Sequence, residues 1–208
     1  MNTITAIEVQ KKRGDRRSIY VDGEFVAGAH EEIVLALSLS VGQTFDKEQL
    51  IALVRAETVR KARESALRLI SYRDRTRSEI RKRLIGNDYP EDIADEVIDK
   101  LSQAGLIDDE KFSRDWVKAR TASKPMGRTR LTWELRSKGV EATMVEEALE
   151  DLDEDAEHAL ALELAARKAE KMDRGDPSFK NRLSSFLRRR GFGWEVISKI
   201  FDELSPEE

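Results

Sequence analysis

A threefold repeat of apolar positions constrains the fold of this chain most strongly. Six apolar positions recur in residues 80–101, 131–152 and 183–204, each time separated by 4, 5, 4, 4 and 4 residues. Intervals of four place side chains on one face of a helix, and the interval of five coincides with turn residues. Each copy therefore predicts a short helix, a tight turn and a second amphipathic helix, and three copies indicate a repeat architecture. The repeated positions are Ile80, Leu84, Tyr89, Ile93, Val97, Leu101; Leu131, Leu135, Val140, Met144, Ala148, Leu152; and Leu183, Leu187, Phe192, Val196, Ile200, Leu204.

Residues before the first copy predict a small β-rich extension. Ser18–Val21 and Glu24–Ala27 flank Asp22-Gly23, and the Asp-Gly pair favours the positive φ angles of a hairpin turn. A short helix follows at about 30–39. We therefore expect a mainly α fold in which an extension precedes three tandem three-helix repeats. The predicted domains are residues 1–45, 46–105, 106–152 and 153–208.

Capping signals indicate where helices begin. Asp46 with Gln49 three residues on is typical of a long helix that runs toward residue 70, with or without a break. Thr76-Arg77-Ser78-Glu79 is a second capping box, and aspartates at 108–109 and 153–155 open the next two repeats. Glycines 139 and 191 occupy equivalent turns. Asp88 is their counterpart in the first repeat, so we expect that turn to be built differently.

Charge alternates in step with the repeat. Residues 55–83, 111–138 and 167–190 carry net charges of +7, +7 and +6, whereas 86–110 and 139–163 carry −8 and −10. One interpretation is that each acidic third helix pairs with the basic helices of the next repeat, in a solvated surface where ion pairs contribute little. The other is that the arginines form a stripe that follows a polyanion. The two interpretations are compatible.

The residues that could bind a partner are mostly basic. Trp133 lies off the apolar stripe among arginines, so it could stack on a base, anchor a partner or pack against an adjacent repeat. The basic hairpin tip at 11–17 forms a separate positive finger, although such tips are commonly only solubilising. The candidate partner-binding residues are Arg73, Arg75, Arg77, Arg81, Lys82, Arg120, Lys124, Arg128, Arg130, Trp133, Arg136, Lys138, Arg188, Arg189 and Arg190.

Catalytic and cofactor signals are lacking in the sequence. It has no cysteine, its two histidines, His30 and His158, lie far apart, and it has neither a Gly-x-x-x-x-Gly-Lys-Ser/Thr nor a Gly-x-Gly-x-x-Gly motif. We therefore expect no enzyme activity, no cofactor and no metal. No apolar run is long enough for a bilayer span and no signal peptide is evident, so we expect a cytoplasmic protein that does not bind a membrane. We also expect it to be a monomer.

The second repeat carries the motifs of a known family. Residues 106–112 read Leu-Ile-Asp-Asp-Glu-Lys-Phe, and Trp116-Val117, Arg120, Lys124, Gly127, Arg130-Leu131, Glu134-Leu135 and Lys138-Gly139-Val140 follow. The first repeat adds Arg77-Ser78-Glu79-Ile80 and Lys82-Arg83-Leu84. With these residues the chain resembles the RecX family, bacterial regulators of the RecA recombinase, over roughly residues 60–204. Asp88 departs from the family pattern, which has glycine there, and the third repeat matches by spacing more than by identity.

The resemblance implies a curved, elongated array of three three-helix repeats that binds the groove of RecA filaments on single-stranded DNA. Such binding would limit filament growth, ATP hydrolysis, strand exchange and co-protease activity, and so act on DNA repair, recombination and the SOS response. One alternative is a direct DNA-binding protein, because a short helix, a turn and a second helix resemble helix-turn-helix modules. The acidic third helices count against it, since they would face phosphates. Another alternative is a purely structural helical scaffold.

Overall fold

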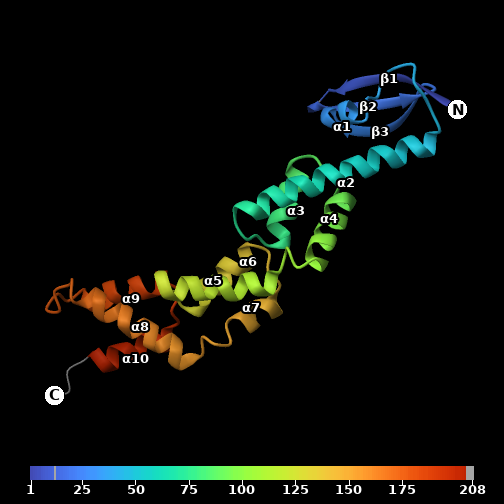
Figure 1. The fold of residues 1–208 in the computed structure, drawn as a ribbon. Coiled ribbons are helices and arrows are strands. Elements are labelled where there is room, and N and C mark those ends of the chain that lie inside the picture. Colours follow the sequence, from blue (N-terminus) through green and yellow to red (C-terminus); the bar gives the residue numbers. More distant parts are fainter. Residues whose placement is uncertain (12, 205–208) are drawn as a thin grey trace. The chain divides into compact units, whose positions relative to one another are not determined.

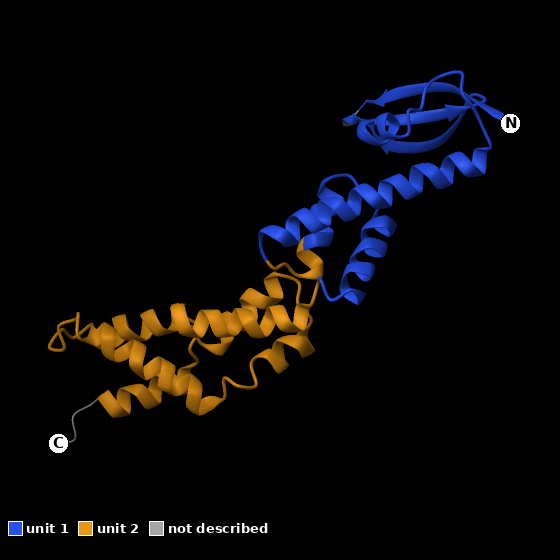
Figure 2. Cartoon of the chain, viewed as in Figure 1, with its two compact units in different colours: residues 1–73, 80–106 blue, residues 74–79, 107–208 orange. Residues whose placement is uncertain are grey.

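The structure is a computed structural model that describes residues 1–11 and 13–204 (Figure 1). It divides into two compact units (Figure 2): the first unit is residues 1–73 with 80–106, and the second unit is residues 74–79 with the chain from 107 onward. Lys12 of the predicted basic hairpin tip lies outside the described residues. The elements in order are β1 (Asn2–Gln10), β2 (Arg13–Val21), β3 (Glu24–His30), α1 (Glu31–Ala36), β4 (Thr44–Phe45), α2 (Lys47–Tyr72), α3 (Arg77–Gly86), α4 (Glu91–Gln103), α5 (Asp109–Ser123), α6 (Arg128–Ser137), α7 (Ala142–Ala148), α8 (Glu154–Ala169), α9 (Phe179–Arg189) and α10 (Trp194–Leu204).

An antiparallel sheet with strand order β3-β2-β1-β4 begins the first unit. The β2–β3 hairpin turns at Asp22 and Gly23, whose φ angles of 52° and 84° are both positive, as predicted for an Asp-Gly turn. Ile4 and Ile19 are fully buried and pack with Ile33 of α1 in one apolar cluster. The predicted β-rich extension is therefore confirmed.

The long helix α2 serves both the sheet and the first repeat. It begins after Asp46, whose Oδ1 accepts the backbone N–H groups of Glu48 and Gln49 at 3.1 Å, so the predicted cap is confirmed. Leu50 in its first turns is fully buried in the sheet cluster. The helix continues without a break to Tyr72, and its later turns contact α4.

Two three-helix repeats, α5–α7 and α8–α10, make up most of the second unit. Each begins with the aspartate cap that the sequence predicts: Asp108 Oδ1 accepts the N–H of Lys111, and Asp153 Oδ1 accepts the N–H of Ala156, both at 2.8 Å. Each repeat has its own apolar cluster.

The repeated apolar positions all face inward. None of the eighteen is exposed, and only Tyr89, Met144, Val196 and Leu204 are half-buried rather than buried. The prediction of three tandem three-helix repeats is therefore confirmed. The predicted domain boundaries stay a prediction.

The turn before the third helix of each repeat has a left-handed residue. Gly139 and Gly191 have φ angles of 80° and 87°, and Asp88 has a φ of 63°. The prediction that the first turn is built differently was therefore wrong, because aspartate is among the few non-glycine residues that tolerate this conformation.

A joint links the second repeat to the start of α3, and all of its residues belong to the second unit. The Thr76 hydroxyl donates to the Lys138 carbonyl at 2.7 Å. The Asp109 carboxylate accepts the N–H of Arg77 at 2.9 Å. Burial raises the pKa of Asp109 above its ordinary value, and the N–H of Arg77 opposes this rise. We call this contact the α3 joint.

An equivalent joint links the third repeat to the start of α6. The N–H of Gly127 donates to the Arg190 carbonyl at 3.0 Å, and Glu157 accepts the N–H of Arg128 at 2.8 Å. Glu157 is buried, and burial raises its pKa against the opposing effect of the Arg128 N–H. We call this contact the α6 joint.

Candidate partner-binding surface

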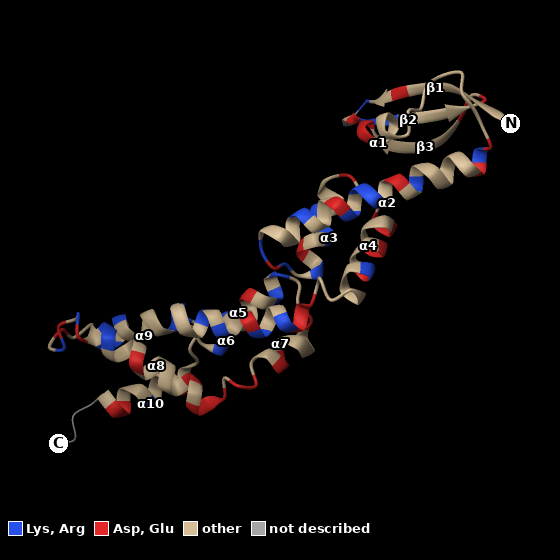
Figure 3. Ribbon diagram, viewed as in Figure 1, with Lys and Arg blue, Asp and Glu red and all other residues tan. Residues whose placement is uncertain are grey.

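Acidic residues are concentrated on helix α4, where Figure 3 colours them red. They pair with basic residues of the same repeat. Arg81 of α3 contacts Asp95 at 2.7 Å and Glu91 at 2.8 Å, and Asp95 foremost raises the pKa of the guanidinium. Arg55 of α2 contacts Glu96 at 2.8 Å and also pairs with Asp92. These ion pairs lie within the first repeat, whereas the charge pattern of the sequence suggested pairing between successive repeats. Arg81 therefore has partners within the fold.

The other candidates near α3 differ in exposure. Arg73 and Arg77 are exposed at the end of α2 and the start of α3, and Arg75 is half-buried between them. Lys82 is exposed on α3 and has no ion-pair partner among residues 1–11 and 13–204.

A buried carboxylate organises the basic side chains of the second repeat. Glu134 is 7% exposed, and its Oε2 accepts Arg120 Nε at 2.9 Å and Trp116 Nε1 at 3.1 Å. Its Oε1 accepts Arg130 Nε at 3.3 Å. Sequence reasoning missed this role. The available signal was that Glu134 is the only acid between Asp115 and Glu141.

Two cations contact the Trp116 ring, and both also pair with carboxylates of the second unit. The Arg120 guanidinium lies 4.5 Å from the ring centroid and Lys138 Nζ lies 4.4 Å from it. Lys138 also contacts Glu79 at 3.0 Å. Arg120 and Lys138 therefore stabilise the interior of the second unit through their contacts with Trp116, Glu134 and Glu79.

Arg128 and Arg190 are likewise engaged within the second unit. Arg128 Nη1 donates to the carbonyls of Leu149 at 2.6 Å and Leu152 at 2.5 Å, beyond the end of α7. Arg190 Nη1 donates to the Pro125 carbonyl at 3.3 Å, close to the α6 joint. The Leu149 carbonyl also accepts the N–H of Leu152 at 3.1 Å, so Arg128 adds a second hydrogen bond there. Both arginines thus donate to carbonyls at a helix end or in a loop.

One face of α6 remains open, and we call Arg130, Trp133 and Arg136 the α6 surface. Trp133 is 58% exposed. The guanidinium of the half-buried Arg130 lies 4.5 Å from its ring centroid. Arg136 is exposed, and its one hydrogen bond among the described residues is a long contact of 3.4 Å to the Val140 carbonyl. The alternative in which Trp133 is buried by packing does not hold within the second unit.

Three further candidate cations are exposed at helix ends of the second unit. Lys124 at the end of α5 and Arg188 and Arg189 in the last turn of α9 are exposed, without an ion-pair partner in the described parts of the chain.

Acidic side chains gather elsewhere on the second unit. A groove of about 650 Å³ between α7 and α8 is lined by Arg128, Thr143 and a set of carboxylates. These carboxylates belong to Glu146, Glu147, Glu150, Asp153 and Glu154. The second unit thus presents a cationic aromatic surface and an acidic groove.

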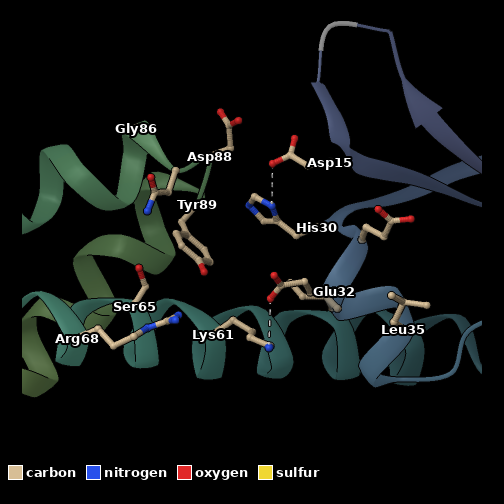
Figure 4. A pocket seen from close by; sticks show the side chains of 13 residues that line it. Asp15, His30, Glu32, Leu35, Lys61, Ser65, Arg68, Gly86, Asp88 and Tyr89 are labelled. Atoms are coloured by element: carbon tan, nitrogen blue, oxygen red, sulfur yellow. Dashed lines mark hydrogen bonds and ion pairs between the residues drawn. The ribbon is translucent and has the colours of Figure 1, made fainter.

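The first unit contains a polar cavity of about 490 Å³ that sequence reasoning missed (Figure 4). His30 of β3 lies 3.6 Å from Asp15 and its ring centroid lies 5.3 Å from that of Tyr89. Lys61 of α2 contacts Glu32 at 3.3 Å across the same cavity. The described part of the chain holds no group of three or more His, Cys, Asp or Glu placed to bind a metal. None of its helices is long and apolar enough to cross a membrane.

Family models match nearly the whole chain. Residues 2–46 match the regulatory protein RecX N-terminal domain, and residues 62–101, 108–149 and 155–201 match the first, second and third three-helix domains of RecX. The match to the second three-helix domain contains the α6 surface and Glu134 with its partners Arg120 and Trp116.

Curated relatives and solved structures agree with these models. The regulatory protein RecX of Mycobacterium ulcerans is 39% identical over 149 residues, which cover 70% of this chain and 86% of that one. That of Clostridioides difficile is 29% identical over 205 residues, covering 98% and 96%. A crystal structure of regulatory protein RecX aligns with a TM-score of 0.67 at 28% identity, covering 97% of this chain and all of that one. RecX from Lactobacillus salivarius aligns with a TM-score of 0.64 at 26% identity, covering 72% and 97%. From its three-helix repeats, its N-terminal sheet and these relatives, the chain belongs to the RecX family of regulatory proteins.

Proposed function

We propose that this protein is a non-enzymatic modulator of the RecA recombinase that binds RecA filaments on single-stranded DNA. Bound in the filament groove, it limits filament growth and so lowers ATP hydrolysis, strand exchange and co-protease activity.

The α6 surface is the observation that carries this proposal. It presents an aromatic ring and two arginines on one helix, while the acidic groove between α7 and α8 lies on the same unit. A nucleoprotein filament offers both phosphates and protein side chains of either charge. A unit that exposes both signs of charge is suited to such a mixed target.

The engaged arginines narrow the set of partner-binding residues. Arg81, Arg120, Arg128, Lys138 and Arg190 contact other parts of the fold, so their loss would disturb it. We assign direct partner contacts to the exposed candidates and to the half-buried Arg130, and we keep Arg73, Arg75 and Arg77 as predicted contacts. The exposed candidates assigned in this way are Lys82, Lys124, Trp133, Arg136, Arg188 and Arg189.

The test is the ATPase rate of RecA on single-stranded DNA. The wild-type protein should lower this rate, and Arg136→Glu should weaken the inhibition by about tenfold in effective concentration, as expected for reversing a charge at an interface. Lys180→Glu is the matched control, because Lys180 is exposed in the same unit, has no ion pair among the described residues and lies outside the α6 surface. If both variants inhibit as strongly as the wild-type protein, the α6 surface is removed from the proposal.

A wild-type protein that leaves the ATPase rate unchanged would favour a structural scaffold.

Direct binding to duplex DNA is the alternative function. The pairing of Arg81 with α4 carboxylates counts against it, because fewer cations remain for phosphates on the first repeat. Titration of naked duplex at several salt concentrations separates the two: tight binding whose logarithmic salt slope is about −0.9 per neutralised phosphate would favour the alternative.

A further inference from the structure

Trp133 occupies a position at which the repeat requires no apolar side chain. Shifting by the repeat period gives Lys82 in the first repeat and Ser185 in the third, and both are exposed polar residues. Packing therefore does not account for an aromatic ring at this site. Trp133 is 58% exposed, so a ligand that covers its ring would gain the free energy of burying apolar surface.

The ring is held in place before any ligand arrives. Arg130 stacks over it at 4.5 Å, and Glu134 fixes Arg130 by a hydrogen bond of 3.3 Å. Glu134 is itself buried and bonded to Arg120 and Trp116. A side chain that is oriented in advance loses less conformational entropy on binding.

The surroundings of the ring are positive. The only acid from residue 116 to 140 is Glu134, which is buried and paired with two arginines. Arg136 lies three residues beyond Trp133, about 4.5 Å further along the helix axis. A base on the ring would therefore have a cation within reach of its neighbouring phosphate.

From these observations we propose that Trp133 is a stacking platform for an unpaired nucleobase, with Arg136 contacting the adjacent phosphate. The ligand is single-stranded nucleic acid, because bases in a duplex are already stacked and present only their edges. This inference rests on the proposed function for its setting, since it names the filament component that the α6 surface contacts. An acidic protein segment would use the arginines but would gain little from the ring.

The experiment measures binding of the full-length protein to fluorescent 12-mers without RecA, by anisotropy at low salt. One probe is oligo(dT) and the other is a fully abasic strand of equal charge. Trp133→Ala should weaken oligo(dT) binding by about 5- to 100-fold, as expected for one lost base–aromatic stack. It should leave binding of the abasic strand unchanged. Trp133→Phe should retain most of the affinity.

Trp194→Ala is the matched control, because Trp194 is the second strongly exposed tryptophan of the same unit, at 68%, and lies outside the α6 surface. It should leave both affinities unchanged. Equal affinity of the wild-type protein for oligo(dT) and the abasic strand would overturn the inference. Equal weakening of both probes by Trp133→Ala would also overturn it, and would assign the surface to phosphate alone. Thermal melts of each variant verify that it is folded.

Failure of this inference can be told from failure of the proposed function. If the wild-type protein inhibits the RecA ATPase but does not distinguish the two probes, the inference falls and the proposed function stands. If it prefers oligo(dT) through Trp133 but has no effect on RecA, the proposed function falls and the stacking site stands.

Discussion

At the α6 joint the backbone N–H of Gly127 donates to the Arg190 carbonyl, whereas at the α3 joint the side-chain hydroxyl of Thr76 donates to the Lys138 carbonyl. In both joints a carboxylate also accepts a backbone N–H.

A Cβ on Gly191 would lie 2.3 Å from the Cβ of Arg130, 2.4 Å from its backbone nitrogen and 2.8 Å from its Cα. A Cβ on Gly139 would lie 2.2 Å from Oγ and 2.3 Å from Cβ of Ser78, but 3.8 Å from its Cα. The repeat thus fixes where the joints form but leaves open which atoms make them. A joint closed by backbone has less freedom to adjust to a substitution than one closed by a side chain.

The largest expected effect is that of Gly191→Ala. Alanine costs about 1–2 kcal/mol in the left-handed conformation, and a clash with backbone adds about 1–3 kcal/mol. We expect the free energy of unfolding to fall by about 3 kcal/mol, measured by urea denaturation. Gly193→Ala is the control, because a Cβ there meets no atom within 4 Å and Gly193 does not have a positive φ. Similar losses of stability in the two variants would contradict the close contact between Gly191 and the Arg130 backbone at the α6 joint.

Gly139→Ala should destabilise the protein less, by about 2 kcal/mol, because the new Cβ would overlap only the Oγ and Cβ of Ser78, whose Cα lies 3.8 Å away. Removing that side chain in Ser78→Gly should rescue part of the loss. We expect a coupling energy of about 1 kcal/mol in the double-mutant cycle of these two substitutions. Strict additivity would show that the two residues do not touch. The φ of 80° at Gly139 predicts that the rescue is incomplete.

The smallest expected effect concerns the carboxylates of the two joints. Burial raises the pKa of both Asp109 and Glu157, so the native state holds a proton to a higher pH than the unfolded chain does. Between the ordinary Asp pKa of 3.8 and the raised native value, the free energy of unfolding therefore falls as the pH rises. Asp109→Asn should remove this contribution.

The measurement is the difference in unfolding free energy between the wild-type protein and Asp109→Asn from pH 4 to 7. Subtraction cancels the opposite trend of carboxylates with lowered pKa values, such as Asp92 and Asp176. Glu157→Gln tests the other joint in the same way. A wild-type advantage that grows as the pH rises would contradict a raised native pKa of the joint carboxylate.

Local signals in the sequence were sufficient for most elements. The Asp22-Gly23 hairpin and the caps at Asp46, Asp108 and Asp153 involve residues within a few positions of one another. The cap at Thr76 also forms as predicted, since its hydroxyl accepts the N–H of Glu79. Such contacts depend on the chain nearby, so a pattern of residue types predicts them.

The site was predicted less completely, because it depends on residues far apart in the sequence. The exposure of Trp133 follows from its place off the apolar stripe. The enclosure of Trp116 by Arg120 and Lys138 does not, and neither does the pairing of Arg81 with α4. The polar cavity of the first unit could not be predicted either, since its walls come from β2, β3, α1, α2 and the turn before α4.

The sequence by itself determined the number of repeats, the position of each helix and the face that each one buries. These properties follow from periodicity and capping, which act over one or two helical turns. Only the tertiary structure decided which cations are available to a partner, because a guanidinium is engaged or exposed according to the carboxylates and carbonyls that folding brings to it. Arg128 and Arg136 are the same residue type on one short helix. Arg128 nevertheless donates hydrogen bonds to carbonyls beyond the end of α7, whereas Arg136 is exposed to solvent.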